Sequence, residues 1–583
     1  MGGHAAGGGA EVGAAPLVAR VVVDEPALDK PFDYLVPEAL GDQVRVGTLV
    51  RVPLHGRRVG GWVSELDVAP PAGVALRPIA KVTGWGPAAE LFDLARWAAW
   101  RWAGRPPHFL RTASPPAAVQ GLPPREASVM VPETPTDPLV GQALRVPCAV
   151  LRQPPATDAY PLVIAAAALG PTLVVTPAHA TAQLLAARLR RAGVPVALLP
   201  REWARAAAGA RVVIGARGAA WAPVPGLAAV VVLDEHEEVH QEEASPTWNA
   251  RDVAAERARR AGVPCVLTSP CPSLEALRWG ELLVPDRSTE RAGWPVVDVV
   301  DRAREDPLRT DLYSPRLVDL VRSGKRVVCV LNRKGRARLL ACAACGDLAR
   351  CERCGAAVAM DDDVLVCRRC AATRPLVCSS CGSSKLKVRR LGTARAREDL
   401  ERLAGVAVGE VTGESDALPD APVLVGTEAV LRRIDHADAV AFLDLDAELL
   451  APRYRAAEQA MALVARAARL VGGKATGGRL LLQTRLPRHE VVLAALHGDP
   501  SRVSAAEAAR REPLGWPPFT ALAHVSGAPA EEYVRALTGV QVLGPADGAY
   551  LVRAPDHQTL CDALAATPRP PGRLRVAVDP LRS

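Results

Sequence analysis

The chain has 583 residues, of which 49% are apolar and 23% are charged, as expected of a globular protein with several domains. The net charge of +8 suits a nucleic-acid partner without requiring one, and the scarcity of aromatic residues, 4%, limits base stacking to a few positions. The longest apolar stretch, 162–177, is broken by Gly170-Pro171, so we predict no membrane-spanning helix. Residues 1–16 lack the features of a signal peptide, and we expect a cytoplasmic protein with reduced cysteines.

The N-terminal quarter of the chain divides into three parts. Residues 1–16 consist largely of Gly and Ala, and we expect a flexible tail. Residues 17–115 contain short runs of alternating apolar and polar residues, followed by a Trp-rich helical run, which together predict a β-rich domain. The proline-rich residues 116–147 are predicted to form a linker. The predicted strands of the β-rich domain are 18–23, 32–37, 48–54 and 57–66.

The remainder of the chain alternates continuous apolar runs with helical runs, the pattern of parallel sheets covered on both faces. We expect one α/β lobe at 148–300 and a second at 301–341 and 382–517. A cysteine-rich insertion, 342–381, interrupts the second lobe, and residues 518–583 are predicted to form a small α+β domain. The fold class is therefore multidomain α/β.

Four Cys-x-x-Cys pairs lie within the insertion, and a Gly follows three of them. Two intervening residues let both thiolates face one ion, and Zn²⁺ takes four thiolates tetrahedrally. We predict two structural zinc ions per chain, with disulfides and an iron–sulfur cluster as alternatives. Only five residues separate the first two pairs, which favours a nested pairing but leaves it open. The predicted ligands are Cys342, Cys345, Cys378 and Cys381 for one ion and Cys351, Cys354, Cys367 and Cys370 for the other.

An acidic strand end in the first lobe is typical of nucleotide-driven motors. The run VVVLDE, 230–235, ends in two carboxylates. In P-loop motors an Asp at the place of Asp234 holds Mg²⁺, and a Glu at the place of Glu235 polarises the attacking water. Acidic residues at strand ends are common, so this pattern alone is a weak indication.

The phosphate-binding loop of such a motor is missing. Its pattern, G-x-x-x-x-G-K-[ST], does not occur in the sequence. In the expected slot, 151–162, Pro154 and Pro155 lack N–H groups and Ala156 stands where the Lys is needed. Only Thr157 is a candidate contact to a nucleotide.

Taken in order, these parts resemble the PriA family of primosomal replication-restart proteins, in a form with degenerate helicase motifs. The resemblance extends over nearly the whole chain, and the cysteine block after LNRKG is its most specific part. The motifs that carry it include FDYLVPE (32–38), GARGAAW (215–221), LDEHEE (233–238), TSPCPSLEAL (268–277), LNRKGRARLLACAACG (331–346), RRLGTARAREDLERL (389–403), VGTEAV (425–430) and GWPPF (515–519).

The resemblance implies an architecture and a set of site residues. It implies a DNA-binding domain for the 3′ end of the nascent strand, a winged-helix region reduced here to a remnant in the linker, two RecA-like helicase lobes, a zinc insertion and a C-terminal α+β domain. By similarity, Phe32, Asp33 and Arg77 fall on the pocket for the 3′-terminal nucleotide. Arg466 and Arg469 fall on the last helicase motif, whose arginines face the γ-phosphate of ATP, although the glycines of that motif are replaced.

The resemblance implies a DNA-binding protein that recognises stalled or abandoned replication forks and promotes reloading of the replicative helicase. We expect no catalytic residue, no helicase activity of its own, and no reliance on ATP and Mg²⁺. The expected partners are forked and single-stranded DNA, primosome and helicase-loading components, and single-strand DNA-binding protein; we expect no membrane partner and a monomer. Two alternatives stay open: an active ATP-dependent 3′–5′ DNA helicase of the same family, and a zinc-ribbon scaffold for protein interactions.

Overall fold

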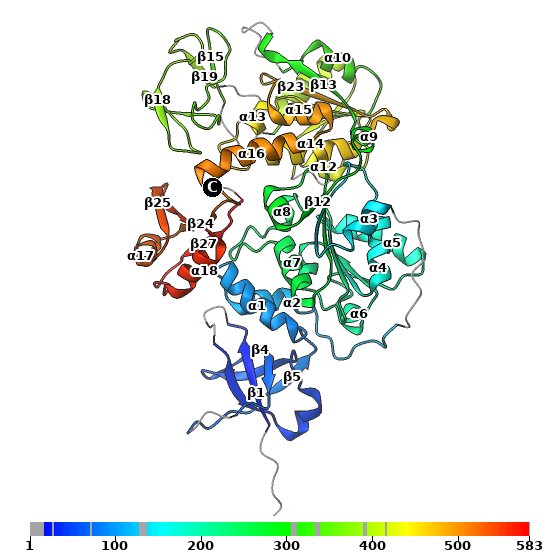
Figure 1. The fold of residues 1–583 in the computed structure, drawn as a ribbon, viewed down its shortest axis with the longest axis vertical. Coiled ribbons are helices and arrows are strands. Elements are labelled where there is room, and N and C mark those ends of the chain that lie inside the picture. The colour runs from blue at the N-terminus through cyan, green and yellow to red at the C-terminus, as the bar shows by residue number, and fades with distance from the viewer. Residues whose placement is uncertain are drawn as a thin grey trace, which may run out of the picture.

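The computed structural model describes residues 17–25, 28, 30–69, 73–126, 137–304, 312–332, 339–388, 393–413, 415 and 417–581. The predicted tail, 1–16, and parts of the LNRKG and RRLGT motifs (333–338 and 389–392) lie outside the described residues. Figure 1 shows an elongated molecule with the N-terminal sheet at the bottom, the two lobes above it, and the cysteine insertion and the C-terminal domain along one side. In the described part of the chain, no helix is long and apolar enough to cross a membrane.

The N-terminal domain is an antiparallel sheet of five strands in the order β2-β1-β4-β3-β5. Its buried side is formed by alternate residues such as Val21, Tyr34 and Val52, as the period of a strand requires. Two helices, α1 (Glu90–Arg101) and α2 (Pro106–Ala113), follow the sheet. The strands are β1 (Val18–Val23), β2 (Phe32–Leu35), β3 (Leu49–Leu54), β4 (Arg57–Leu66) and β5 (Lys81–Gly84).

The first lobe is a parallel sheet of seven strands in the order β12-β6-β11-β10-β7-β9-β8, with helices on both faces. Its strands are almost wholly apolar because both faces are covered. They are β6 (Cys148–Arg152), β7 (Thr172–Val175), β8 (Val196–Leu198), β9 (Val212–Gly215), β10 (Ala229–Val232), β11 (Cys265–Ser269) and β12 (Glu281–Leu283). The helices are α3 (Pro138–Ala143), α4 (Tyr160–Leu169), α5 (His179–Arg191), α6 (Trp203–Ala208), α7 (Ala250–Ala261), α8 (Leu274–Trp279) and α9 (Arg287–Ala292).

The second lobe is a parallel sheet of six strands in the order β13-β23-β22-β14-β21-β20. The strands are β13 (Val296–Asp301), β14 (Val327–Val330), β20 (Val408–Val411), β21 (Val423–Gly426), β22 (Ala439–Phe442) and β23 (Arg479–Thr484). The helices are α10 (Pro315–Val321), α11 (Thr393–Ala404), α12 (Val430–Arg433), α13 (Asp446–Leu449), α14 (Ala456–Val471), α15 (Glu490–His497) and α16 (Ser501–Leu514).

Two boundaries differ from those expected. Strand β13 was assigned to the first lobe, which was expected to end at residue 300, but it pairs in parallel with β23 and so belongs to the second sheet. Residues 116–147 are predicted to form a linker with a winged-helix remnant, but their helix α3 packs into the core of the first lobe through Val140 and Ala143. Both elements are short, and their tertiary partners rather than their local composition decide where they belong.

The cysteine insertion and the C-terminal domain are the two smaller units. The insertion leaves and re-enters the second lobe through the antiparallel pair β15 (Leu340–Cys342) and β19 (Leu386–Val388), and its other strands are β16 (Ala359–Asp361), β17 (Val364–Val366) and β18 (Thr373–Pro375). The C-terminal domain is an antiparallel sheet in the order β25-β26-β24-β27 with two helices. Its elements are β24 (Ala521–Ser526), α17 (Ala530–Ala536), β25 (Gln541–Ala546), β26 (Ala549–Ala554), α18 (His557–Ala566) and β27 (Arg575–Val578).

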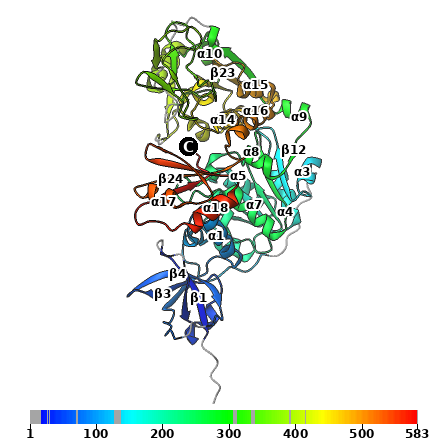
Figure 2. The ribbon, with the colours of Figure 1, turned by 60° about the vertical axis from the view of Figure 1, so that its left-hand side comes forward.

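Helices α1 and α2, the first lobe and the C-terminal domain share one apolar core. Figures 1 and 2 both show α1 against α18 and α7. Polar contacts reinforce this joint. Asp579 accepts hydrogen bonds from Arg101 of α1 (2.6 Å) and contacts His557 of α18 (2.9 Å). The hydroxyl of Thr247, in the loop after the acidic strand, donates to the carbonyl of Val578 (2.8 Å). The acidic strand end of the first lobe is therefore tied to the C-terminal sheet.

Candidate functional sites

The eight cysteines of the insertion form two four-sulfur clusters, and within each cluster the sulfur atoms all lie within 4.8 Å of one another. The clusters join the first pair with the fourth and the second with the third, which is the nested arrangement. Across the pairs, the Sγ atoms of Cys342 and Cys381 are 3.5 Å apart, and those of Cys354 and Cys367 are 3.5 Å apart. A tetrahedral ion at ~2.3 Å from each sulfur would separate the sulfurs by about 3.8 Å.

Each Cys-x-x-Cys pair closes a tight turn of the same kind. The residue after the second cysteine has positive φ in all four turns: Gly346, Gly355 and Gly382 at 74° and Ala371 at 57°. Its N–H donates to the carbonyl of the first cysteine, for example from Gly355 to Cys351 at 2.8 Å. Glycine adopts this conformation without steric cost, which explains its presence at three of the four positions. Each cluster could hold a metal ion.

We call the group of Cys351, Cys354, Cys367 and Cys370 the inner cluster and the group of Cys342, Cys345, Cys378 and Cys381 the outer cluster. The inner cluster is attached to the second lobe. Leu348 and Ala357 of the insertion pack with Leu450, and the N–H of Ala357 donates to the carbonyl of Leu450 at 2.9 Å. Arg369 bridges the two units by donating to the carbonyls of Cys354 (3.1 Å) and Ala451 (2.8 Å). The inner cluster is buried among apolar residues, whereas Cys345 and Cys381 of the outer cluster are exposed.

The slot of the phosphate loop lies where the sequence predicted, between β6 and α4, and faces the end of β10. An arginine from the second lobe reaches into this place. The guanidinium of Arg469 donates to Asp234 (Nη1 to Oδ2, 2.6 Å), forms a second bond to the same carboxylate, and donates through Nε to the carbonyl of Pro155 (2.6 Å). Thr157 lines an adjoining cavity of about 320 Å³ together with Asp234 and Arg469.

The ion pair determines the charge state of Asp234. Burial alone would raise the pKa of the Asp234 carboxyl group, but the Arg469 guanidinium holds that pKa below its ordinary value. Asp234 also has φ of 52°, a conformation that is uncommon for a residue with a side chain. The residue expected to hold Mg²⁺ is thus an ionised carboxylate whose oxygens are both engaged by a protein cation.

The second acidic residue is enclosed as well. Glu235 is 2% exposed, and its Oε1 accepts from the N–H of Ser273 at 2.8 Å. Its Oε2 accepts from the Ser273 hydroxyl (2.8 Å) and from Arg251 (3.2 Å). Sequence reasoning identified Glu235 but missed these two partners, for which the residue order holds no recognisable signal.

Arg466, one helical turn before Arg469, also crosses to the first lobe. Its Nε donates to Oε1 of Glu237 at 3.0 Å, and a second bond joins the same two side chains. Burial would raise the pKa of Glu237, but Arg466 keeps that pKa below its ordinary value. Residues three apart on a helix lie on one face, so α14 presents both arginines to the acidic loop of the other lobe.

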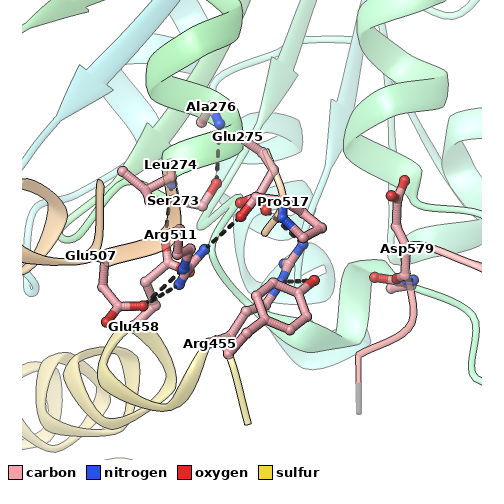
Figure 3. A network of polar contacts seen from close by, with 12 residues as sticks. Ser273, Leu274, Glu275, Ala276, Arg455, Glu458, Glu507, Arg511, Pro517 and Asp579 are labelled. Carbon is pink, nitrogen blue, oxygen red and sulfur yellow. Dashed lines mark hydrogen bonds and ion pairs between the residues drawn. The ribbon is translucent and has the colours of Figure 1, made fainter. Parts of the chain in front are cut away.

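A buried polar network, shown in Figure 3, adds further contacts between the lobes. Arg455 of the second lobe donates to Glu275 of α8 at 2.7 Å, and Glu458 accepts from the N–H of Leu274 at 2.9 Å. Arg511 of α16 is 2% exposed, contacts Glu458, and donates to Glu507 at 2.9 Å. Sequence analysis did not identify this network, because its members are scattered charged residues without a motif.

The three residues assigned to the DNA 3′ end lie at one edge of the N-terminal sheet. Phe32 and Asp33 are neighbours on β2, and the segment of Arg77 runs beside that strand, with the N–H of Leu35 donating to the Arg77 carbonyl at 3.0 Å. Phe32 is half-buried against the core of the domain, and Arg77 is exposed. Asp33 forms an ion pair with Arg20 at 2.9 Å. The aromatic ring and the carboxylate leave the strand on opposite sides.

Comparison with known proteins agrees with this architecture. Residues 20–115 match the model of a 3′ DNA-binding domain of the PriA type. A probable replication restart protein PriA of Mycobacterium tuberculosis is 30% identical to this chain, and the match covers 95% of this chain and 91% of that protein. The chain belongs to the PriA family of replication restart proteins.

Coverage differs among the other relatives named PriA. The PriA of Mycobacterium leprae is 28% identical and is covered over 91% of its length, whereas the PriA of Treponema pallidum is 32% identical and is covered over 51%. The chain thus spans about half the length of several PriA relatives that it matches, including that of Treponema. A solved DEAD box protein from Methanococcus jannaschii covers 65% of this chain and 96% of its own, at 10% identity and a TM-score of 0.31.

Proposed function

We propose that this PriA-family chain recognises the 3′ end of the nascent strand at a stalled or abandoned replication fork and supports replication restart without hydrolysing ATP. The family and the 3′ DNA-binding domain at 20–115 support the DNA-end role. The observation that carries the proposal of an inert motor is the pairing of Arg469 with Asp234 and Pro155. In this view the lobes serve as a rigid frame.

Three features argue against ATP turnover. Phosphoryl transfer needs backbone donors and a Lys around the phosphates, but Pro154 and Pro155 have no N–H and Ala156 has no charge. Asp234 is neutralised by Arg469 where a metal ion would have to bind. Both oxygens of Glu235 already accept hydrogen bonds from Ser273 or Arg251, which leaves one acceptor position, on Oε1, for a water molecule. Losing one stabilising contact costs about 10²–10³ in rate, and several are lost together.

We further propose that both cysteine clusters hold zinc with a structural role. Four thiolates leave no open coordination position for chemistry, and the turns orient the sulfurs without help from a bound substrate. The inner ion would fasten the insertion to the second lobe through the segment that contacts Leu450 and Ala451. The expected protein partners, namely helicase-loading components and single-strand DNA-binding protein, belong to the same proposal.

The DNA-end role is tested with full-length protein and a synthetic fork whose nascent strand ends in a 3′ hydroxyl or a 3′ phosphate. We expect tighter binding to the hydroxyl end, and we expect Asp33→Asn to weaken that preference strongly because the carboxylate accepts a charge-assisted hydrogen bond from the hydroxyl. The matched control is Asp67→Asn, another carboxylate of the N-terminal domain. Equal affinity of the unaltered protein for both ends would contradict the proposed function.

A further inference from the structure

Three charged residues form a line across the N-terminal sheet. Arg20 on β1 lies directly opposite Asp33 on β2 and directly opposite Glu65 on β4. Arg20 donates through Nε to Oδ1 of Asp33 (2.9 Å), through Nη2 to Oδ2 of Asp33 (3.3 Å), and through Nη1 to Oε2 of Glu65 (3.0 Å). One guanidinium therefore holds both carboxylates.

The line lies on the face of the sheet that points away from the core formed by Val21 and Tyr34. Directly opposite residues share a face, and the neighbours Ala19, Val21 and Tyr34 point into the core instead. The side chains become more exposed along the line, from 14% for Asp33 through 30% for Arg20 to 47% for Glu65. A change in register between Arg20 and Val21 sets Glu65 opposite Arg20, and the hydroxyl of Ser64 donates to the Arg20 carbonyl at 3.1 Å.

From this geometry we infer that Arg20 and Glu65 determine the specificity of the Asp33 site for an unphosphorylated 3′ end; the inference rests on the proposed function. Each oxygen of Asp33 accepts one hydrogen bond from Arg20. About two of the four acceptor positions of the Asp33 carboxylate therefore stay available for a 3′ hydroxyl. The planar fork of the guanidinium fixes the orientation of the carboxylate before DNA arrives. Arg20 is thus a positioning residue.

Glu65 has a different part. Asp33 and Arg20 alone would be neutral overall, and an arginine beside the strand end would attract a phosphate. With Glu65 the three residues carry a net charge of −1. Arg20 donates two hydrogen bonds to Asp33 and a third to Glu65. A terminal phosphate would meet like charge and an already occupied guanidinium. The line therefore accepts a hydroxyl and rejects a phosphate.

The test measures the ratio of dissociation constants for forks with a 3′ phosphate and a 3′ hydroxyl, using the full chain. For Arg20→Gln the readout is the dissociation constant of the 3′-hydroxyl fork itself, because the two remaining carboxylates repel a phosphate more strongly. We expect this variant to bind the hydroxyl end about tenfold more weakly, because Asp33 loses its charged partner and its fixed orientation. Arg20→Lys keeps the charge but has no fork, and we expect a value between those of Arg20→Gln and the unaltered protein. Glu65→Gln should lower the ratio about threefold, chiefly through tighter binding of the phosphate end.

The matched control is Arg58→Gln, an exposed arginine on the same strand as Glu65. Loss of a general phosphate contact there would weaken both forks alike and leave the ratio unchanged. If the unaltered protein does not distinguish the two ends, the proposed function itself fails. If it does, and Asp33→Asn removes the preference while Arg20→Gln binds the hydroxyl fork as tightly as the unaltered protein and Glu65→Gln keeps the ratio, the inference is overturned and the proposed function stands. Should Arg20→Gln not fold, an unchanged ratio in Glu65→Gln overturns the inference alone.

Discussion

The cysteine insertion and the cleft between the lobes both look like ion-binding sites in the sequence, but their structures differ in one respect. In the insertion, eight thiols converge on two centres, and among the described residues no ion pair or hydrogen bond joins an Arg or Lys side chain to their sulfur atoms. In the cleft, the carboxylates of Asp234 and Glu237 are each matched by an arginine from α14. Ligand atoms that are not paired with a charged side chain of the protein can bind a metal ion. Carboxylates that are already paired with arginines act instead as contacts between the lobes.

The sharpest way to break this comparison is to remove a cysteine from each cluster. Cys367→Ser should lower the zinc content from two ions to one and loosen the insertion, because the inner cluster is buried and a structural zinc site contributes on the order of 10 kcal/mol. Cys381→Ser, in the exposed outer cluster, should also lose one ion but leave the contact to Leu450 intact. Elemental analysis together with limited proteolysis measures both. A protein that contains no zinc, or iron instead, contradicts the expectation.

The second prediction concerns the buried network between the lobes. Arg511→Met leaves Glu458 buried without its ion-pair partner, whereas Glu507 keeps Arg510, and we expect the second lobe to lose about 3–5 kcal/mol of stability. The exposed pair Arg535–Glu531 provides the control, since Arg535→Met should cost about 0–1 kcal/mol. Urea unfolding curves, together with hydrogen exchange in α14 of the folded protein, measure the difference in stability between the two variants. Equal losses in the two variants would show that the network does not hold the lobes together.

A smaller effect is expected from acid. The Arg469 guanidinium holds the pKa of Asp234 below its ordinary value of about 3.9, so this pair stabilises the closed cleft above that pH. The stabilisation is lost as the pH falls through the lower pKa of the folded state. The protection factors of the α14 amides, which correct for the intrinsic pH dependence of hydrogen exchange, should therefore fall at low pH, and Arg469→Gln should remove part of that fall. An identical pH profile in Arg469→Gln would mean that the pair contributes nothing.

Sequence patterns were sufficient where the chemistry is local. The Cys-x-x-Cys spacing predicted the two clusters, and continuous apolar runs predicted the strands of both parallel sheets, because each depends on neighbours a few residues away. The place of β13 could not be predicted, because its partner β23 lies some 180 residues further along the chain. The loss of the phosphate loop is visible in Pro154 and Pro155, and the resemblance implies a place near the nucleotide for Arg469, but the pairing of Arg469 with Asp234, 235 residues away, could not be predicted.

The central claim is that the cleft of this PriA-family protein does not turn over ATP, and phosphate release from highly purified protein in the presence of forked DNA tests it most directly. The account predicts a rate at background, unchanged in Asp234→Asn and Glu235→Gln. DNA binding by the same preparation should not depend on added ATP. A steady rate of about one per second, within the usual range for enzymes and abolished by both substitutions, would contradict the account and show that the motor is active.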